Sequence, residues 1–158
     1  ITHITPLSAD IYPLDVKDNH AIIERILENG WYEIEPSHIW SKDNASLTLP
    51  VPDICKTNYC ELSLSAYAYG ASEQRPVNVT IQNNHDGQVY EKKVSISDSN
   101  THKLNIELNM SDRPVTVTLS IPEAISPEKL QGTNDNRQLG IALQSINILV
   151  IGDKVIEK

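Results

Sequence analysis

Polar and aromatic side chains alternate with aliphatic ones from Cys60 to Tyr69, and this run is the part of the sequence best suited to bind a ligand. Successive side chains of a strand point to opposite faces, so the alternation places the polar set on the solvent face. Two tyrosine rings on that face could stack on a sugar ring while neighbouring polar groups bond its hydroxyls. The rings could equally be covered by a loop or by another part of a longer protein. The predicted glycan-binding residues are Tyr67, Tyr69, Glu61, Ser63 and Ser65.

A catalytic pair is harder to assemble from these residues. Glu33 and Glu35 lie two apart and would share one side of an extended segment, as a glycosidase pair might. That chemistry needs carboxylates facing each other across a substrate at about 5 to 9.5 Å, which neighbours on one strand rarely achieve. The sequence has neither Gly-x-Ser-x-Gly nor a glycine-rich phosphate loop. We therefore expect no catalytic residues, and a small glycan hydrolase or esterase stays open as the enzymatic alternative.

Metal and cofactor sites are not predicted. The five histidines are scattered, with no two at the spacing of a zinc site. Asn134-Asp135-Asn136 offers oxygen ligands, yet calcium normally takes six to eight oxygens and only one carboxylate is present there. Turn-forming Asx residues explain this composition without a metal.

Cys55 and Cys60 form a disulfide candidate that would close a short polar loop. Closing so small a loop removes little unfolded-state entropy, so the gain in stability would be modest. The pair is compatible with an oxidising compartment, and two reduced thiols remain the alternative.

Length and charge exclude several classes of protein. The chain of 158 residues is one domain by length, and its net charge of −8 argues against nucleic acid, where affinity comes mostly from Lys and Arg. No apolar run approaches the roughly 18 residues of a membrane span, and the first residues do not resemble a signal peptide. Because the chain starts at Ile1 rather than Met, we expect a piece excised from a longer protein.

Strict two-residue alternation recurs from Leu47 to Ile148 and predicts an all-β fold, an antiparallel β-sandwich of jelly-roll type. One short helix is expected near the N-terminus, from about Asp18 to Glu28, where an apolar stripe ends at Asn29-Gly30. We expect residues 1–17 to be a linker remnant and residues 18–158 to form the sandwich.

Turn signals divide the strands. Asp86-Gly87 predicts a hairpin, and the change of phase within Gln88–Ile96 indicates a bulge or an edge strand. Leu139 to Ile151 is apolar on both phases at its end, as for a central strand. Between them, residues 122–137 are expected to form a long loop.

Two segments together resemble a known family. GWYEIEPSHIWS at Gly30–Ser41, followed by ASLTLP at Ala45–Pro50, is similar to a "GW…E…W(S/T)…A.L.LP" pattern. NDNRQLGIALQSI at Asn134–Ile146 is similar to "(D)xRxLGIAL.S(I/L).I". Both patterns resemble the C-terminal accessory β-sandwich domains of bacterial envelope polymer enzymes, including phosphoglycerol transferases of the periplasmic-glucan type and related glycosyltransferases. This sequence departs from the pattern at His38-Ile39, where a Gly-Arg pair is common.

The resemblance implies a non-catalytic domain that faces the periplasm as part of a membrane-anchored protein. Its expected partner is an envelope glycan acceptor or the catalytic domain of the parent transferase, without nucleic acid, membrane insertion or cofactor. The nucleophile and metal ligands of those transferases lie in a separate sulfatase-like domain. A free-standing carbohydrate-binding module is the alternative.

The two motifs also fit a structural role. An arginine at the mouth of the last long strand could bond a carboxylate bidentately and tie that strand to the first motif. Gly140 would permit close strand contact, and the two tryptophans are expected in the core or at a seam. The structural candidates are Arg137, Glu35, Trp31 and Trp40.

Overall fold

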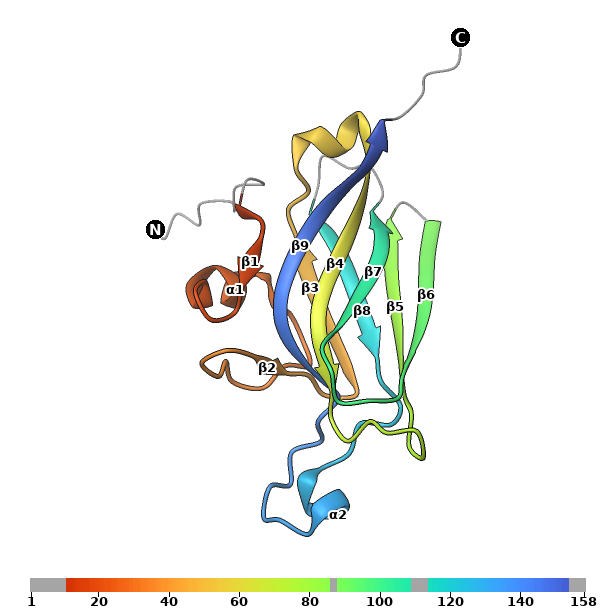
Figure 1. Cartoon of the computed structure of the whole chain (residues 1–158). Coiled ribbons are helices and arrows are strands. Elements are labelled where there is room, and N and C mark those ends of the chain that lie inside the picture. The colour runs from red at the N-terminus through yellow and green to blue at the C-terminus, as the bar shows by residue number, and fades with distance from the viewer. Residues whose placement is uncertain (1–10, 86–87, 109–113, 154–158) are drawn as a thin grey trace.

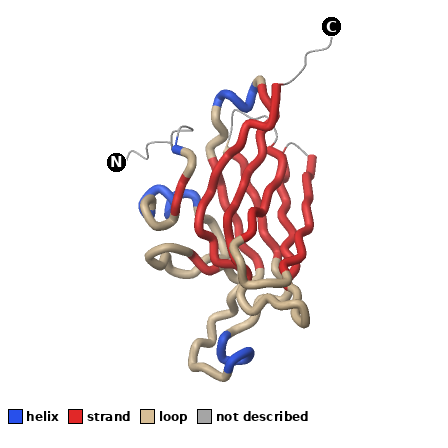
Figure 2. The backbone as a smooth tube through the Cα atoms, in the orientation of Figure 1, coloured by secondary structure: helices blue, strands red, loops and turns tan. Residues whose placement is uncertain are grey.

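The computed structural model describes residues 11–85, 88–108 and 114–153, and shows two antiparallel sheets packed face to face (Figure 1, Figure 2). In the first sheet the order is β1-β9-β4-β7, with β2 also paired to β9. Its strands are β1 (Leu14–Asp15), β2 (Ile39–Trp40), β4 (Asn58–Ala68), β7 (His102–Leu108) and β9 (Ile141–Asp153). The second sheet has the order β3-β8-β5-β6. Its strands are β3 (Asn44–Leu49), β5 (Val77–His85), β6 (Gln88–Ile96) and β8 (Val115–Ser120). The predicted β-sandwich is confirmed.

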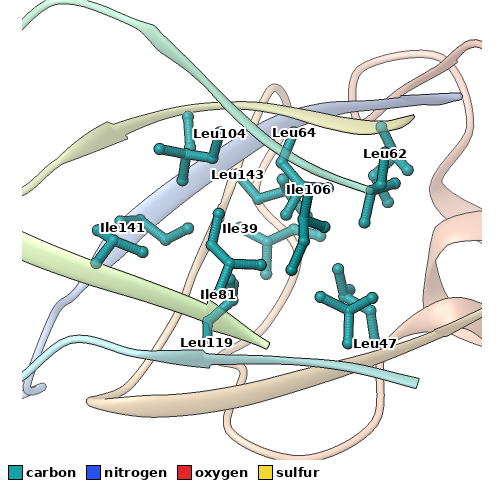
Figure 3. Packing of buried hydrophobic residues seen from close by; sticks show 14 of the residues in the cluster. Ile39, Leu47, Leu62, Leu64, Ile81, Leu104, Ile106, Leu119, Ile141 and Leu143 are labelled. Carbon is teal, nitrogen blue, oxygen red and sulfur yellow. The ribbon is translucent and has the colours of Figure 1, made fainter. Parts of the chain in front are cut away.

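The core lies between the two sheets and is made of the aliphatic side chains that alternate along each strand. In Figure 3, Leu62 and Leu64 of β4 lie across from Ile81 of β5 and Leu119 of β8. Each of these four side chains is at most 1% exposed. Since neighbouring positions on the same strands are polar and more exposed, each sheet keeps one apolar inner face and one polar outer face.

Helices are short and lie outside the sandwich (Figure 1). The predicted N-terminal helix is confirmed as α1 (His20–Ile26), which buries Ile23 and Ile26. A 3₁₀ helix, η2 (Asp53–Lys56), precedes β4. Within the expected long loop, the structure adds a second α-helix, α2 (Pro127–Gln131).

The N-terminal segment contributes to the core. Leu14 pairs with Ile146 of β9, and both Leu14 and Val16 are fully buried. The structure thus builds residues 14–16 into the sandwich rather than leaving them as linker, because their apolar side chains cover the end of the core. Residues 1–10 lie outside the described part of the chain.

Several local predictions can be compared with the strands. β5 and β6 pair up to His85 and Gln88, as the predicted hairpin requires, although Asp86-Gly87 itself lies outside the described residues. β6 is an edge strand, as expected. β9 lies between β4 and the short strands β1 and β2 only up to Ile146. Its apolar end pairs with β4 alone among the described strands, and Val150 and Ile151 are 48% and 59% exposed, so the prediction of a central strand is wrong for that end. Cys55 and Cys60 form a disulfide with a Cα–Cα distance of 5.6 Å.

Candidate functional site

A hairpin-like excursion between α1 and β3, residues 31–41, carries the first motif out over the first sheet. Trp31 bridges Ser41 at its base, and the amide of Tyr32 donates to the carbonyl of Trp40 at 3.0 Å. Near its tip, the amide of Glu35 donates to the carbonyl of His38 at 2.9 Å. Pro36 and Ser37 form the bend between them, so Glu35 and His38 are brought close together.

The second motif meets the first where Gly140 passes Ser41. The Gly140 amide donates to the Ser41 carbonyl at 2.8 Å, and the Ile141 amide donates to Ser41 Oγ at 3.0 Å. A Cβ at residue 140 would lie 2.7 Å from Ser41 Oγ and 2.8 Å from the Lys42 carbonyl oxygen. The close strand contact predicted at Gly140 is therefore confirmed, and it fixes the two motifs against each other.

Five rings gather where these segments lie over β4. We call Tyr32, His38, Trp40, Tyr67 and Tyr69 the aromatic cluster. Trp40 is its centre and is 8% exposed. The Tyr67 and Tyr69 rings meet it edge-on, with centroid distances of 5.4 and 5.7 Å, and the His38 ring does so at 5.5 Å. Edge-to-face packing at these distances is favourable beyond the area it buries. The half-buried tyrosines are thus held in place by Trp40.

Hydroxyl groups of the cluster differ in what they bond. Tyr69 donates its hydroxyl to Gln131 Oε1 at 2.8 Å, and the Tyr32 hydroxyl both accepts from and donates to the backbone of Gln138. The Tyr67 hydroxyl has no hydrogen-bond partner within the described residues. Burial, and then the nearby Glu35 charge, raise the pKa of Tyr67. Its neutral hydroxyl is therefore available to a ligand.

Arg137 forms its bidentate pair with Asp135 rather than with Glu35. The Arg137 Nη2 to Asp135 Oδ2 distance is 2.7 Å, and Nε also donates to this carboxylate. Glu35 Oε2 lies 3.7 Å from Arg137 Nη1, an ion pair without a hydrogen bond. The predicted bidentate tie to Glu35 is wrong in this respect, because Asp135 is only two residues away and the Arg137 amide also bonds its Oδ1. These bonds lower the pKa of Asp135 and raise that of Arg137.

The Glu35 carboxylate keeps an unused acceptor. Its Oε2 atom is buried, and His38 Nε2 lies 3.2 Å from it. That distance is within hydrogen-bond range, but the orientation is not that of a hydrogen bond, and the contact is an ion pair only when His38 is protonated. Because Oε2 itself is closed to solvent, a ligand would reach this carboxylate through the rest of the side chain, which is 37% exposed.

The other predicted ligand residues lie elsewhere along β4. Glu61 and Tyr67 are six positions apart, about 20 Å along a strand. Ser63 is 4% exposed, and Glu61 pairs across the sheet with Glu107, a contact between like charges. Ser65 lies between these two groups. The structure therefore brings Tyr67 and Tyr69 to the site and leaves Glu61 and Ser63 outside it.

Sequence reasoning missed the role of Tyr32, His38 and Gln131, since the first two reach the cluster from a loop and Gln131 reaches it from the end of α2. Trp31 lies at a seam, as predicted, where its Nε1 donates to the Ser46 carbonyl at 2.8 Å. Trp40 is also a seam residue, packed with Leu139 and Ala142 on the outer face of the first sheet.

The structure does not bring Glu33 and Glu35 together as a catalytic pair. Glu33 lines a groove against α1 together with His20, Glu24 and Glu28, whereas Glu35 contacts His38 and Arg137. The two carboxylates therefore belong to different surroundings. Among the described residues, no group of three or more His, Cys, Asp or Glu side chains could hold a metal ion. The Asp135 carboxylate of the oxygen-rich loop is already paired with Arg137.

No helix in the described part of the chain is both long and apolar enough to cross a membrane.

Comparison with known proteins identifies one family and several solved structures that resemble this chain. Residues 39–150 match the model of a family described as "Domain of unknown function (DUF7024)". No curated protein matches the sequence. A solved structure of a family GH115 4-O-methyl-alpha-glucuronidase, BtGH115A, with specificity for decorated arabinogalactans, aligns with 95% of this chain at 9% identity and a TM-score of 0.52. This chain spans 19% of that protein, and the likeness shows the fold alone.

Two carbohydrate-binding modules align less well. TmCBM61 in complex with beta-1,4-galactotriose shares 10% identity over 90% of this chain and 86% of the module, with a TM-score of 0.40. The Family 16 Carbohydrate Binding Module-2 shares 10% identity over 73% of this chain and 77% of the module, with a TM-score of 0.38.

Proposed function

Because this chain belongs to the DUF7024 family, whose function is unknown, we propose its role from its own site: a non-catalytic module that binds glycan at the aromatic cluster. One observation carries the proposal. Half-buried tyrosine rings, fixed by Trp40, lie beside the Tyr67 hydroxyl, which bonds no described residue, and beside the Glu35 side chain, which is 37% exposed.

Sugars match both parts of this arrangement. The C–H faces of a pyranose pack on aromatic rings, and its hydroxyls donate to carboxylates and accept from phenols. A sugar hydroxyl could donate to the Glu35 carboxylate, whose side chain is 37% exposed. Binding at such an open face is expected to be weak, because little of the ligand is buried.

The glucuronidase adds a precedent for the fold. A region of that enzyme, whose described specificity is for decorated arabinogalactans, has a similar sandwich. This likeness supports the proposal that a sandwich with this fold can form part of a carbohydrate-active protein.

For the whole protein, we propose a periplasmic accessory domain of a membrane-anchored envelope transferase of the phosphoglycerol type. The support is the motif resemblance, together with the contact between the two motifs at Ser41 and Gly140. In this role the cluster would position the glycan acceptor. A free-standing binding module is the alternative, and the full-length gene distinguishes the two by the presence or absence of transmembrane helices and a sulfatase-like domain.

Docking on the catalytic domain is the second candidate function. The five rings of the aromatic cluster are also suited to a protein contact, because aromatic residues are enriched in interfaces. Titration with the separate catalytic domain would then shift signals of the cluster, whereas sugars would not.

The test uses Trp40 as the reporter. The chain has two tryptophans, so Trp31→Phe leaves Trp40 as the only one, at the centre of the cluster. Titration with β-linked gluco-oligosaccharides should change its fluorescence in a saturable way. Signals that stay constant at millimolar sugar would contradict the proposal for this ligand class.

Tyr67→Phe then isolates the free hydroxyl. Loss of one hydrogen bond is worth about 0.5 to 1.5 kcal/mol, so the affinity should fall about 2- to 10-fold. Tyr59→Phe is the matched control, since Tyr59 lies on the same strand, 58% exposed and outside the cluster. Replacing Tyr67 and Tyr69 by alanine is less informative, because both rings pack on Trp40 and their loss would also lower stability.

A further inference from the structure

A groove of about 560 Å³ lies on the outer face of the second sheet. We call it the outer groove. Its polar lining comes from all four strands of that sheet and from the segment after α1. The lining side chains that the argument uses are Ser46, Thr80, Gln82, Glu91, Lys93 and Thr118.

Strand register explains why these side chains form one surface. Ser46 of β3 pairs with Thr118 of β8, which pairs with Gln82 of β5, which pairs with Glu91 of β6. Thr80 and Lys93 form part of the next row, two residues along each strand. Paired residues point to the same face, so both rows lie side by side on the solvent side.

Differences in side-chain length make this surface concave. Short hydroxyl side chains form the floor on the inner strands, including Thr80 and Thr118. Longer side chains, Glu91 and Lys93, rise along the edge strand β6. Asn29 stands at the opposite rim, where its segment adds to β3 through the bond from the Ser46 amide to the Asn29 carbonyl at 2.9 Å.

We propose that the outer groove is a second carbohydrate-binding site, which takes an uncharged oligosaccharide through hydrogen bonds rather than ring stacking. Hydroxyl and amide side chains both donate and accept, as sugar hydroxyls do, and adjacent strands space them about 4.8 Å apart. The volume lies within the roughly 300 to 1,000 Å³ of ligand sites. None of the described residues that line the groove is aromatic.

Other ligand classes fit the lining less well. The rim carries one cation, Lys93, beside one anion, Glu91, so it does not favour phosphate chains or nucleic acid. A protein interface has an apolar centre, but the apolar residues of the lining, Ala45 and Leu119, are 4% and 1% exposed and belong to the core. A neutral polyhydroxylated chain remains the ligand that matches.

This site does not depend on the aromatic cluster, which belongs to the other sheet. The experiment therefore follows both sites at once by backbone amide shifts of the isotope-labelled chain. The probes are neutral gluco-, xylo- and galacto-oligosaccharides of three to six units, at millimolar concentration. We expect saturable shifts at Thr80, Gln82 and Thr118.

Thr80→Val with Thr118→Val removes two floor hydroxyls at nearly constant shape. The double variant should weaken binding at the groove at least 10-fold and leave shifts at the aromatic cluster unchanged. Thr48→Val with Thr116→Val is the matched control on the same outer face, since these two hydroxyls bond each other at 3.1 Å and do not line the groove. That control should bind as the unaltered chain does.

Two results would overturn the proposal. One is the absence of groove shifts with every probe, whatever the cluster shows. The other is groove shifts that persist unchanged in the Thr80→Val and Thr118→Val variant. Cluster shifts that are absent with every probe, or that keep their full affinity in Tyr67→Phe, while groove shifts are retained, would count against the proposed function alone.

Discussion

The two outer faces of this sandwich are built in different ways. The outer groove consists of side chains on consecutive strands, and the ladder pairing alone sets their spacing. The aromatic cluster instead joins residues 31–41, β4 and residues 131–140, which meet through the contact between Ser41 and Gly140. A face set by strand register tolerates side-chain replacement, whereas a face set by loop packing does not. The following predictions test that difference.

Trp40→Ala should have the largest effect. It removes the centre of the cluster and leaves a cavity beneath two tyrosines, which typically costs about 3 to 5 kcal/mol. The measurement is the free energy of unfolding in urea. Thr118→Val in the outer groove should change it by less than about 0.5 kcal/mol. Similar losses in both variants would remove the distinction between the two faces.

Gly140→Ala should come next, at about 1 to 3 kcal/mol, because the added Cβ would lie 2.7 Å from Ser41 Oγ and 2.8 Å from a backbone oxygen. Gly152→Ala is the matched control, within the strand β9 that Gly140 directly precedes, since a Cβ there meets nothing within 4 Å. Chemical denaturation of both variants gives the comparison. Equal stability of the two variants would show that the motif contact adapts easily.

Cys55→Ser with Cys60→Ser should cost about 2 kcal/mol or less, since the bridge closes a loop with a sequence separation of 5. Because the disulfide lies at the far end of β4 from the cluster, sugar titration of the variant should follow the same curve as the parent chain. A changed affinity would mean that the two ends of β4 are coupled.

Arg137→Gln should have the smallest effect, and it should depend on pH. Both partners of the Arg137–Asp135 pair are about a third exposed, so solvent screens their attraction. The pKa of Asp135 is lowered in the folded state, so the stabilisation is present above the unfolded-state pKa, about 3.9, and is lost as the pH falls through the lower folded value. The stability difference between parent and variant should therefore shrink below about pH 4. A difference that stays constant down to pH 2 would assign it to packing on Tyr32 instead.

The sandwich was predictable because alternation is local. Runs such as Val115, Val117 and Leu119 assign their own inner face, and the edge position of β6 was visible as a change of phase. Helix α2 was missed although its signals are in the sequence. Ser126 caps the helix by accepting from the Lys129 amide, Pro127 is the first residue, and Gly132 ends it with φ of +72°.

The site was predictable only in part. Tyr67 and Tyr69 follow from the strand pattern, but nothing local places His38 or Gln131 beside them, because their approach depends on how a loop and the end of α2 are carried over β4. The choice of Asp135 over Glu35 as the partner of Arg137 is also a matter of loop geometry. Both carboxylates are plausible from sequence, and the nearer one wins since it needs no long-range ordering.

Strand β1 also decides how the fold would respond to mechanical force. It is two residues long and antiparallel to β9, so the N-terminal end of β1 lies beside the part of β9 that leads toward the C-terminus. A pull on the two chain ends would therefore load the Leu14 and Asp15 pairings one after another, as in unzipping, rather than together, as in shear. Under tension the bond from the Tyr12 hydroxyl to the Pro50 carbonyl, just before β1, would be loaded first, and peeling of β1 would follow. That event would withdraw Leu14 and Val16 from the core while β4, and the tyrosines that it carries, stay paired with the rest of β9.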